Sequence, residues 1–263
     1  INGNVSYTEP LNKNNFLLVN YTAVYTDNYS SKRTFDKNYI EYSYRDLDST
    51  LTNVFKNQYQ SQSGSLGYRY QKEKFNFSLN AAYQRAQLSK EQEIPTSYKL
   101  SKTFESILPS AQLQYKFSQK KNLRFNYRTS NNAPSIDQLQ DVINNSNSLQ
   151  LSTGNPDLKQ DFQQNIFLRY SGVNTNKATS FFALIGGNYS NNFIGTITLL
   201  ANHDTTVYND IFLQRGSQII RPVNLDGYFS LRSFINYTFP IKKIKTNLSV
   251  NVSGNYNNVP GMI

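Results

Sequence analysis

Apolar and polar residues alternate with a period of two along several segments of the chain. The clearest segment is 75–83, whose apolar positions are Phe75, Phe77, Leu79, Ala81 and Tyr83. Successive side chains of a β-strand point to opposite faces, so this pattern predicts a strand with one apolar face and one polar face. The same alternation recurs at residues 17–25, 107–117, 123–128, 165–170, 229–237 and 247–256.

Short and long connections alternate between these predicted strands. Short connections are expected at residues 9–14, 71–74, 118–122, 173–177 and 240–245. Long polar connections are expected near residues 26–55, 89–102, 130–160 and 202–222. An up-and-down meander of this kind is typical of a transmembrane β-barrel with short periplasmic turns and long extracellular loops.

The pattern therefore predicts an all-β fold, an antiparallel up-and-down transmembrane β-barrel with about ten strands in this chain. Several predicted strands are longer than the roughly 9 to 11 residues that cross a bilayer. We expect the barrel wall to extend beyond the membrane.

The composition agrees with an all-β fold and excludes several other classes. Hydrophobic residues make up 38% of the chain and the mean hydropathy is -0.60, values too polar for a bundle of membrane-spanning helices. Aromatic residues make up 14% and charged residues 17%, whereas disordered chains are poor in aromatic residues and rich in charge. The chain has no cysteine, which excludes disulfides, thiolate nucleophiles and cysteine-based zinc sites.

A soluble β-sandwich or jelly roll also has alternating strands and remains an alternative. Two observations favour the barrel. The polar faces hold mostly asparagine, serine, glutamine and arginine, which suits a hydrated lumen better than a solvent-exposed outer face rich in lysine and glutamate. In addition, a Greek key does not require short and long connections to alternate.

The formal net charge of +10 has a definite distribution. Lysines cluster in or beside the short connections, and arginines fall on the polar strand faces: Arg69, Arg124, Arg128, Arg169 and Arg232. The alternation places the aromatic residues on the opposite face, whereas nucleic-acid modules present both kinds on one surface, so no nucleic-acid partner is expected. Two interpretations of the arginines stay open: ion pairs within the lumen, or contacts to a plug or an anionic solute.

The sequence offers little to catalysis or metal binding. His203 is the single histidine, it lies in a long connection, and no nucleotide-binding, zinc-protease or serine-hydrolase motif is present. Asp46, Asp48, Glu91 and Glu93 are spaced two apart in polar segments but lack the glycine and further oxygen ligands of a calcium loop. We expect no enzyme activity, no cofactor and no metal site.

Residues 128–170 form the most informative segment. Pro134 and Ser135 begin a short helical turn with Ile136 and Leu139 at helical spacing, and the run Gly154-Asn155-Pro156 predicts a tight bend. The segment is therefore a long structured loop.

The motifs of this loop resemble a known family. The run APSIDQL, followed by LSTGNPDLKQD and an aromatic strand, resembles the barrel signature of TonB-dependent outer-membrane receptors. Gln160 and Asp161 depart from that signature, which has Pro-Glu there. Residues 5–25 and 227–261, with the turns YTEPL and FPIK, resemble the outer-membrane β-barrel family common in Bacteroidota. The three matches cover about half of the chain and carry little information on the substrate.

The resemblance implies the barrel of an energy-coupled importer in the outer membrane of a Gram-negative bacterium. Such receptors have about 22 strands around a plugged lumen, so residues 1–263 are expected to be one barrel segment of a longer protein. The implied partners are outer-membrane lipid, a plug domain of the same chain, a TonB-type energy-coupling protein and a surface lipoprotein. The candidate ligand contacts are Arg124, Arg128, Arg169, Arg232, Asn155 and Asp157.

Two other functions remain open. The first is a non-transporting barrel: a structural or secretion-associated outer-membrane protein, or a complete small barrel that closes on itself. The second is a soluble β-sandwich that serves as a binding module. A plug domain in the same protein would argue against the first, and behaviour as a monodisperse chain in buffer without detergent would favour the second.

Overall fold

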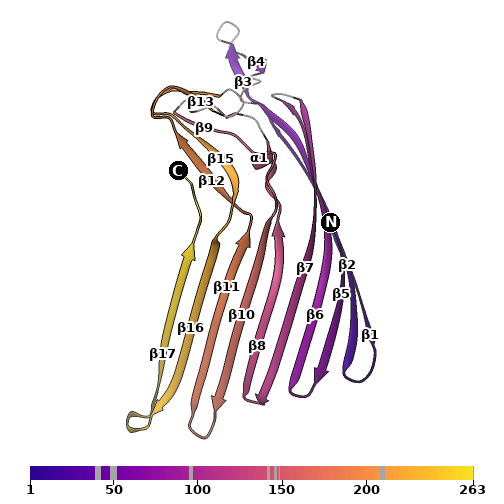
Figure 1. Cartoon of the computed structure of the whole chain (residues 1–263), viewed down its shortest axis with the longest axis vertical. Helices are drawn as coiled ribbons and strands as arrows, with labels where there is room; N and C mark the ends of the chain where they lie inside the picture. The colour runs from indigo at the N-terminus through magenta and orange to yellow at the C-terminus, as the bar shows by residue number, and fades with distance from the viewer. Residues whose placement is uncertain are drawn as a thin grey trace. The chain divides into compact units, whose positions relative to one another are not determined.

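A ten-stranded antiparallel sheet dominates the chain (Figure 1). The structure is a computed structural model that describes residues 1–38, 43–47, 52–94, 97–140, 143–144, 147, 149–207 and 211–262. Neighbouring strands follow chain order: β1 (Asn2–Pro10), β2 (Asn15–Lys32), β5 (Asn53–Lys72), β6 (Phe75–Ile94), β7 (Tyr98–Ser118), β8 (Lys121–Asn132), β10 (Asp161–Asn174), β11 (Thr179–Asn191), β16 (Tyr228–Ile241) and β17 (Thr246–Asn258). The predicted up-and-down arrangement and strand number are confirmed.

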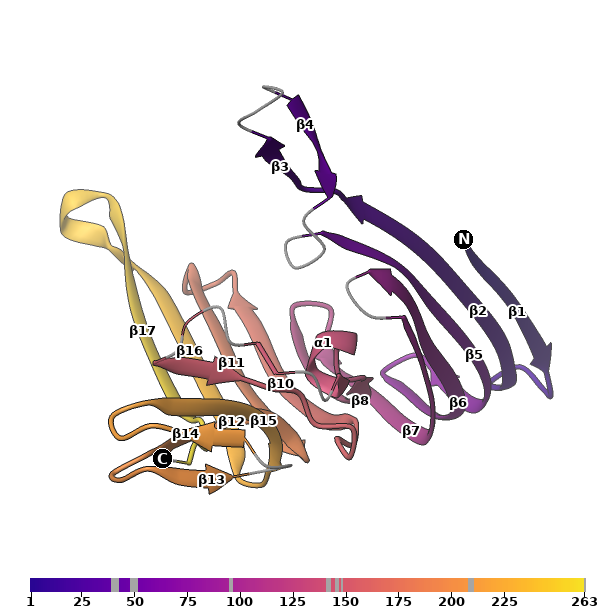
Figure 2. The same ribbon diagram turned by 90° about the horizontal axis from the view of Figure 1, so that it is seen from above.

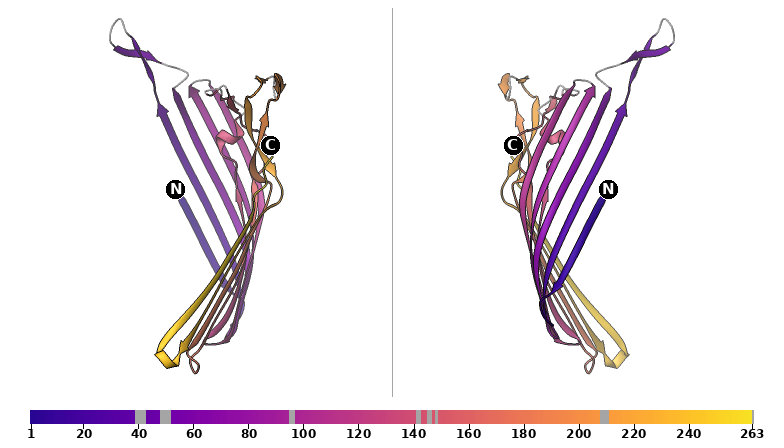
Figure 3. Two further views of the ribbon diagram at one scale, coloured as in Figure 1. Left: turned by 90° about the vertical axis from the view of Figure 1, so that its left-hand side faces the viewer. Right: turned by 90° about the vertical axis from the view of Figure 1, so that its right-hand side faces the viewer.

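The chain divides into two compact units, both of which contain parts of these strands. The first comprises residues 1–6, 20–64 and 83–107, and the second comprises 7–19, 65–82 and 108–263. The five predicted short connections belong to the second unit and lie at one end of its strands (Figures 1 and 3). The predicted short connections are confirmed, and non-glycine residues with positive φ, Ala178 and Lys245, reverse the chain in two of them.

Cross-strand register assigns the paired residues of β7, β8, β10, β11, β16 and β17 to one face or the other. Ala111, Tyr127, Ile166, Gly187 and Leu231 occupy one row across five strands. The next row on that face toward the tight turns is also apolar across four strands, with Leu113, Phe125, Leu168 and Ile185. Large side chains here are exposed, Ile185 to 50% and Val252 to 61%. An apolar face this extensive needs lipid or protein to cover it.

Aromatic rings form a band on the apolar face near the tight turns. Successive ring contacts of 4.8 to 6.5 Å link Tyr115, Phe117, Tyr170, Phe181, Tyr237 and Phe239. These rings come from β7, β10, β11 and β16. Tyrosine and phenylalanine thus supply the interfacial girdle of a membrane barrel although the chain has no tryptophan.

The predicted long connection at 89–102 is wrong, because β6 continues to Ile94 and β7 begins at Tyr98. The apolar row of β6 ends at Tyr83, and the same face continues with Arg85, Gln87 and Ser89. This change of polarity hides the strand from a search for alternating apolar residues. The apolar rows span nine residues on β6, from Phe75 to Tyr83, and eleven on β7, from Ile107 to Phe117, which matches the length needed to cross a bilayer.

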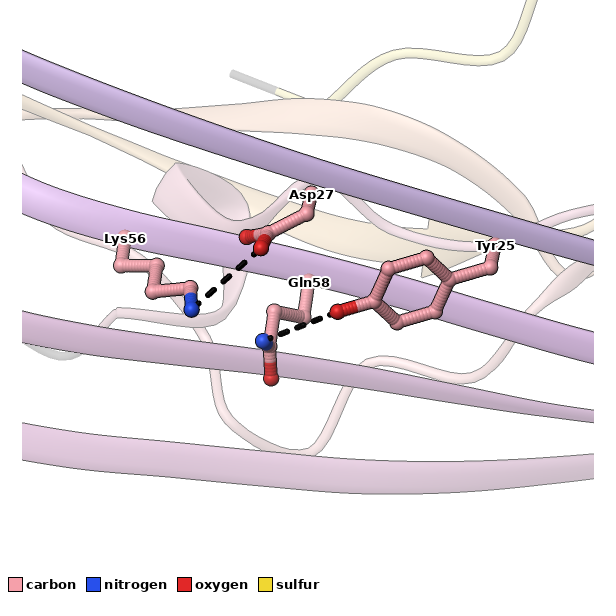
Figure 4. Close-up of polar contacts among 4 residues, drawn as sticks. All are labelled: Tyr25, Asp27, Lys56 and Gln58. Carbon is pink, nitrogen blue, oxygen red and sulfur yellow. Dashed lines mark hydrogen bonds and ion pairs between the residues drawn. The ribbon is translucent and has the colours of Figure 1, made fainter. Parts of the chain in front are cut away.

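Beyond the apolar rows, cross-strand polar contacts hold the strands of the first unit together. Lys56 of β5 contacts Asp27 of β2 at 3.3 Å, and Gln58 donates to the hydroxyl of Tyr25 (Figure 4). On the neighbouring pair, Lys99 contacts Glu91 at 2.8 Å and Gln87 donates to Ser101. The predicted connection at 26–55 is accordingly shorter, since β2 runs to Lys32 and β5 begins at Asn53, with the hairpin β3 (Phe35–Asn38) and β4 (Ser43–Leu47) between them.

The long connections of the second unit contain further short strands with an apolar core. Strands β12 (Phe193–Leu200), β15 (Gln218–Leu225) and β9 (Gln150–Ser152) form a three-stranded sheet, beside the hairpin β13 (Thr205–Val207) and β14 (Ile211–Leu213) (Figure 2). Their apolar core consists of Leu151, Ala201, Ile211, Leu213 and Ile219. The predicted connection at 202–222 is thus part of a longer folded segment, and the predicted loop 130–160 is confirmed.

The helical turn and the bend predicted in that loop are confirmed. Helix α1 (Ile136–Leu139) has Ser135 as its N-cap, with a reciprocal hydrogen bond between Ser135 and Gln138. Both Ile136 and Leu139 are buried. No helix among the described residues is long and apolar enough to cross a membrane.

Candidate functional site

The polar face of the second unit carries the predicted arginines. Arg124 of β8 and Arg169 of β10 are direct cross-strand partners, and Gln114 of β7 lies beside Arg124 in the same row. Arg128 and Arg232 occupy other rows of the same face, opposite Ser110 and Gly186. The structure therefore confirms that these four arginines share the face opposite the apolar rows.

Carboxylates do not neutralise these arginines within the described part of the chain. The ion pairs found there join Lys56 to Asp27, Arg85 to Glu105 and Lys99 to Glu91. Like charges directly opposite each other on neighbouring strands are destabilising, so the pair Arg124–Arg169 is unfavourable without a counter-anion. The described residues therefore do not contain the ion pairs that the first interpretation of these arginines expects.

Two of the arginines lie over phenylalanine rings instead. The Arg169 guanidinium is 5.0 Å from the ring centre of Phe182, and that of Arg232 is 4.8 Å from Phe167. Phe182 also meets Phe234 edge to face, with ring centres 5.9 Å apart. We call Arg169, Arg232, Phe167, Phe182 and Phe234 the arginine–phenylalanine lattice.

The lattice corrects the expectation that all aromatic residues lie opposite the arginines. Phe167, Phe182 and Phe234 lie on the polar face, since they pair with Asn126, Asn236 and Ser253. Their neighbours Ile166, Phe181 and Ile235 are apolar as well. Alternation alone therefore cannot predict which face of the sheet each of these side chains occupies. Cross-strand register is needed to assign them.

Glycine makes room for this lattice. A Cβ atom at Gly186 would lie 2.6 Å from Phe167 Cε1 and 3.1 Å from Arg232 Nε. The absence of a side chain at Gly186 allows the Phe167 ring and the Arg232 guanidinium to stack across β11.

A hollow of about 400 Å3 opens on the polar face at the tight-turn end. Its lining includes Arg69, Asn76, Gln112, Gln114, Arg124 and Asn126. The two guanidinium groups come from β5 and β8, and the amide side chains come from β6, β7 and β8. We call it the arginine–amide hollow; Arg69 enters the site here, although it was not among the predicted ligand contacts.

Asn155 is held by the loop itself. Its Nδ2 donates to the carbonyl of Pro222 at 3.0 Å, and its Oδ1 accepts from the Asp157 backbone and from Arg221. Arg221 also donates to the Gly154 carbonyl. Asp157 is exposed in the turn. The structure thus brings Asn155 and Asp157 together in the connection between β9 and β10, apart from the arginines of the strands.

The unusual Gln160-Asp161 pair also has a structural explanation. Asp161 is 5% exposed and accepts hydrogen bonds from Ser190 and from Gln163 Nε2. These contacts tie the start of β10 to the end of β11.

The remaining polar candidates do not converge. His203 is exposed, and no cluster of three metal-ligating side chains occurs among the described residues. Asp48 and the side chain of Asp46 lie outside the described part. Glu91, on the part of β6 beyond the apolar row, has a lowered pKa because Lys99 donates to it, and the pKa of Lys99 is raised by the same contact.

Comparison with known proteins agrees with this geometry. A model of the outer membrane protein beta-barrel family matches residues 1–262. No curated protein matches in sequence.

Solved structures share the fold. The copper transporter OprC matches 98% of this chain with a TM-score of 0.61 and 10% identity, over 37% of its own length. The FrpB iron transporter from Neisseria meningitidis matches 97% of this chain (TM-score 0.55, 8% identity, 35% of its length). The hemophore receptor HasR of Serratia marcescens, in complex with its hemophore HasA and heme, matches 95% (TM-score 0.52, 11% identity, 40% of its length). The chain thus spans between a third and two fifths of these relatives, and its fold is the outer-membrane β-barrel fold of TonB-dependent receptors.

Proposed function

The chain belongs to the outer membrane protein beta-barrel family and lies in the outer membrane, and we propose that it is part of the barrel of a TonB-dependent importer of a scarce solute. The apolar face contacts lipid. The polar face lines a hydrated lumen and contacts the solute or the plug. The loop carrying Asn155 and Asp157 would offer further contacts to the solute at the extracellular side.

One observation carries the proposal: the polar face keeps four arginines without carboxylate partners among the described residues. A barrel that serves only as a structural element has no need for several cations without counter-ions on its polar face. Arginines directed to a lumen attract anions and carboxylates. The arrangement therefore favours a binding and transport role over the non-transporting barrel.

We propose that residues 1–263 are one barrel segment, completed by further strands and a plug domain of the same protein. The chain covers 35% to 40% of the transporter and receptor structures described above, which supports this division. The same reasoning makes a TonB-type energy-coupling protein the expected partner, with a surface lipoprotein as a further one. The YTEPL and FPIK turns support an origin in Bacteroidota.

We propose no covalent chemistry and no bound cofactor for this segment. The solved relatives are transporters or receptors of iron, copper and heme, so these three are the first solutes to examine. His203, the one histidine, is exposed beside Asp204, whose Oδ1 accepts from the Arg215 backbone.

Uptake by cells tests the proposal. Cells with and without the full-length protein are supplied with iron, copper or heme, before and after the proton gradient is collapsed. We expect one solute to accumulate only with the protein and only with the gradient intact. Deletion of the loop segment 143–158 should lower binding of that solute.

Equal accumulation of all three in both strains, with a heat-modifiable band close to 30.2 kDa, would support the non-transporting small barrel instead. Recovery of the protein in the soluble fraction would support the β-sandwich binding module instead. A chain several times heavier that migrates anomalously without boiling supports the receptor.

A further inference from the structure

The arginine–amide hollow combines several features of an anion site. Arg69 on β5 and Arg124 on β8 line it from two strands, and Gln112 and Gln114 line it from β7, which lies between those strands. Asn126 of β8 completes the amide side chains named here. None of the lining residues is acidic. Two guanidinium groups with amide donors around one space form a positively charged pocket suited to an oxyanion.

The charge of Arg124 is not relieved by its neighbours. Its direct cross-strand partner is Arg169, and the Arg169 guanidinium lies over the Phe182 ring on the opposite side, toward β11. Arg169 thus has a favourable contact away from Arg124, while Arg124 faces the hollow. A bound anion would remove the repulsion that the row otherwise retains.

The hollow also holds an unsatisfied polar atom. Oδ1 of Asn76 is buried and has no hydrogen-bond partner in the structure. An orphaned buried acceptor costs free energy, so rotation of the Asn76 amide into the hollow, where a hydroxyl or protonated oxygen of a ligand could donate to it, would be favourable. A space of about 400 Å3 accommodates a small organic anion.

We propose that the arginine–amide hollow binds an oxyanion, a carboxylate or phosphate group, at the tight-turn end of the wall. Arg69 and Arg124 each donate two parallel N–H bonds to the anion, and the amides complete its hydrogen bonding. In a barrel the tight turns face the periplasm, so the site lies where a solute leaves the lumen. The anion belongs either to a free solute or to a carboxylate side chain of the polypeptide that fills the lumen.

This inference deepens the proposed function, because the hollow lies in the wall of the proposed pathway. The experiment nevertheless measures the electrostatic potential in the hollow and whether an anion is bound there. Its result therefore does not depend on whether the protein transports a solute. The chain has no cysteine, which allows a single reporter to be placed in the hollow.

The experiment uses Asn126→Cys in the full-length protein, with any cysteine elsewhere replaced. The rates of modification by an anionic and a cationic methanethiosulfonate reagent are compared at low salt. We expect the anionic reagent to react faster, and the ratio of the two rates to fall about tenfold when Arg69→Gln and Arg124→Gln are added. Arg128→Gln removes the same charge from the same strand and face but does not line the hollow, so it should leave the ratio nearly unchanged.

Added inorganic phosphate or citrate separates the two sources of the anion. Slowed modification that requires Arg69 and Arg124 indicates a free solute. Protection that needs no added anion, and is lost in the Arg69→Gln and Arg124→Gln variant, indicates a carboxylate of the polypeptide. Lysine at both positions should keep the rate ratio but weaken phosphate protection, because lysine cannot bind bidentately.

The proposal is overturned if the rate ratio is the same in the parent, in the double variant and in the Arg128→Gln control. Heat-modifiable migration on gels verifies that each variant is folded. A folded double variant with unchanged ratio and unchanged phosphate response excludes an anion site in the hollow.

Discussion

Charged residues on the two faces of the strands are treated in opposite ways. On the face that continues the apolar rows, Asp27 pairs with Lys56 and Glu91 pairs with Lys99. Lys56 also lowers the pKa of Glu91, so charges of alternating sign run across β2, β5, β6 and β7. On the polar face, the arginines contact rings and line a hollow instead.

The difference separates charges that neutralise each other from charges that have no counter-ion among the described residues. Alternating pairs satisfy each other and need nothing else. Arginines stacked on phenylalanine keep their N–H edges available, because a ring covers only the face of the guanidinium group. The four predictions below test this distinction in the full-length protein, from the largest expected effect to the smallest.

Filling the space at Gly186 should have the largest effect. The Cβ of Gly186→Ala would lie 2.6 Å from the Phe167 ring and displace it from Arg232. We expect a loss of roughly 1 to 3 kcal/mol in the free energy of unfolding, measured by urea denaturation in detergent. Gly187→Ala is the matched control, since its Cβ meets only the Ser230 carbonyl at 3.9 Å. Equal losses in both variants would mean that the lattice is not tightly packed.

Removing one ring should cost less and should depend on its arginine. Phe182→Leu loses the edge-to-face contact with Phe234 and the contact with Arg169, about 1 to 2 kcal/mol together. A double-mutant cycle with Arg169→Gln isolates the second part, which we expect to be about 0.5 to 1 kcal/mol. A coupling energy of zero would mean that Arg169 stacks on the ring without gaining stability.

Removing Arg124 should stabilise the fold slightly. Arg124→Gln ends the opposition to Arg169, which predicts a gain of a few tenths of a kcal/mol at low salt, in the range known for cross-strand pairs. The gain should shrink as salt screens the repulsion. The opposite result would be that Arg124→Gln is less stable than the parent at low salt and that added phosphate stabilises the parent alone. That result would instead show that the parent hollow binds an anion through Arg124.

The two faces also explain which parts of the fold can be predicted from the sequence alone. Strict alternation in β6 up to Tyr83 is sufficient to predict a strand, its lipid face and its tight turn. Beyond Tyr83 both faces carry polar residues, so the second half of β6 has no apolar period and depends on ladder bonds and contacts such as Gln87 with Ser101.

The candidate site divides in the same way. The polar-face arginines follow from alternation alone. The lattice and the hollow do not, because strand register brings together residues that are far apart in the sequence. Phe167 and Arg232 of the lattice are 65 positions apart, and Arg69 and Asn126 of the hollow are 57 positions apart. The loop candidate Asn155 was identified by motif, but its fixed role depends on Arg221 and Pro222, which no local pattern connects to it.

Breaking an exposed pair on the outer row should have the smallest effect. Glu91 and Lys99 are solvent-exposed, so their contact is screened and adds little to stability. The pKa of Glu91 is lowered from its ordinary value of 4.5, chiefly by the hydrogen bond from Lys99. Its contribution is therefore present above the unfolded pKa and is lost as pH falls through the folded pKa.

Glu91→Gln should accordingly lower the urea midpoint only slightly at pH 7, and parent and variant should converge as the pH falls below 4.5. The pKa of Lys99 is raised, so its contribution is lost only as pH rises through that raised value, well above the acid range tested. Lys13→Gln, which removes an exposed charge from a tight turn, controls for the change in net charge. If Glu91→Gln destabilised as much as Gly186→Ala, the outer pairs would be as important to the fold as the lattice, and the contrast between the two faces would fail.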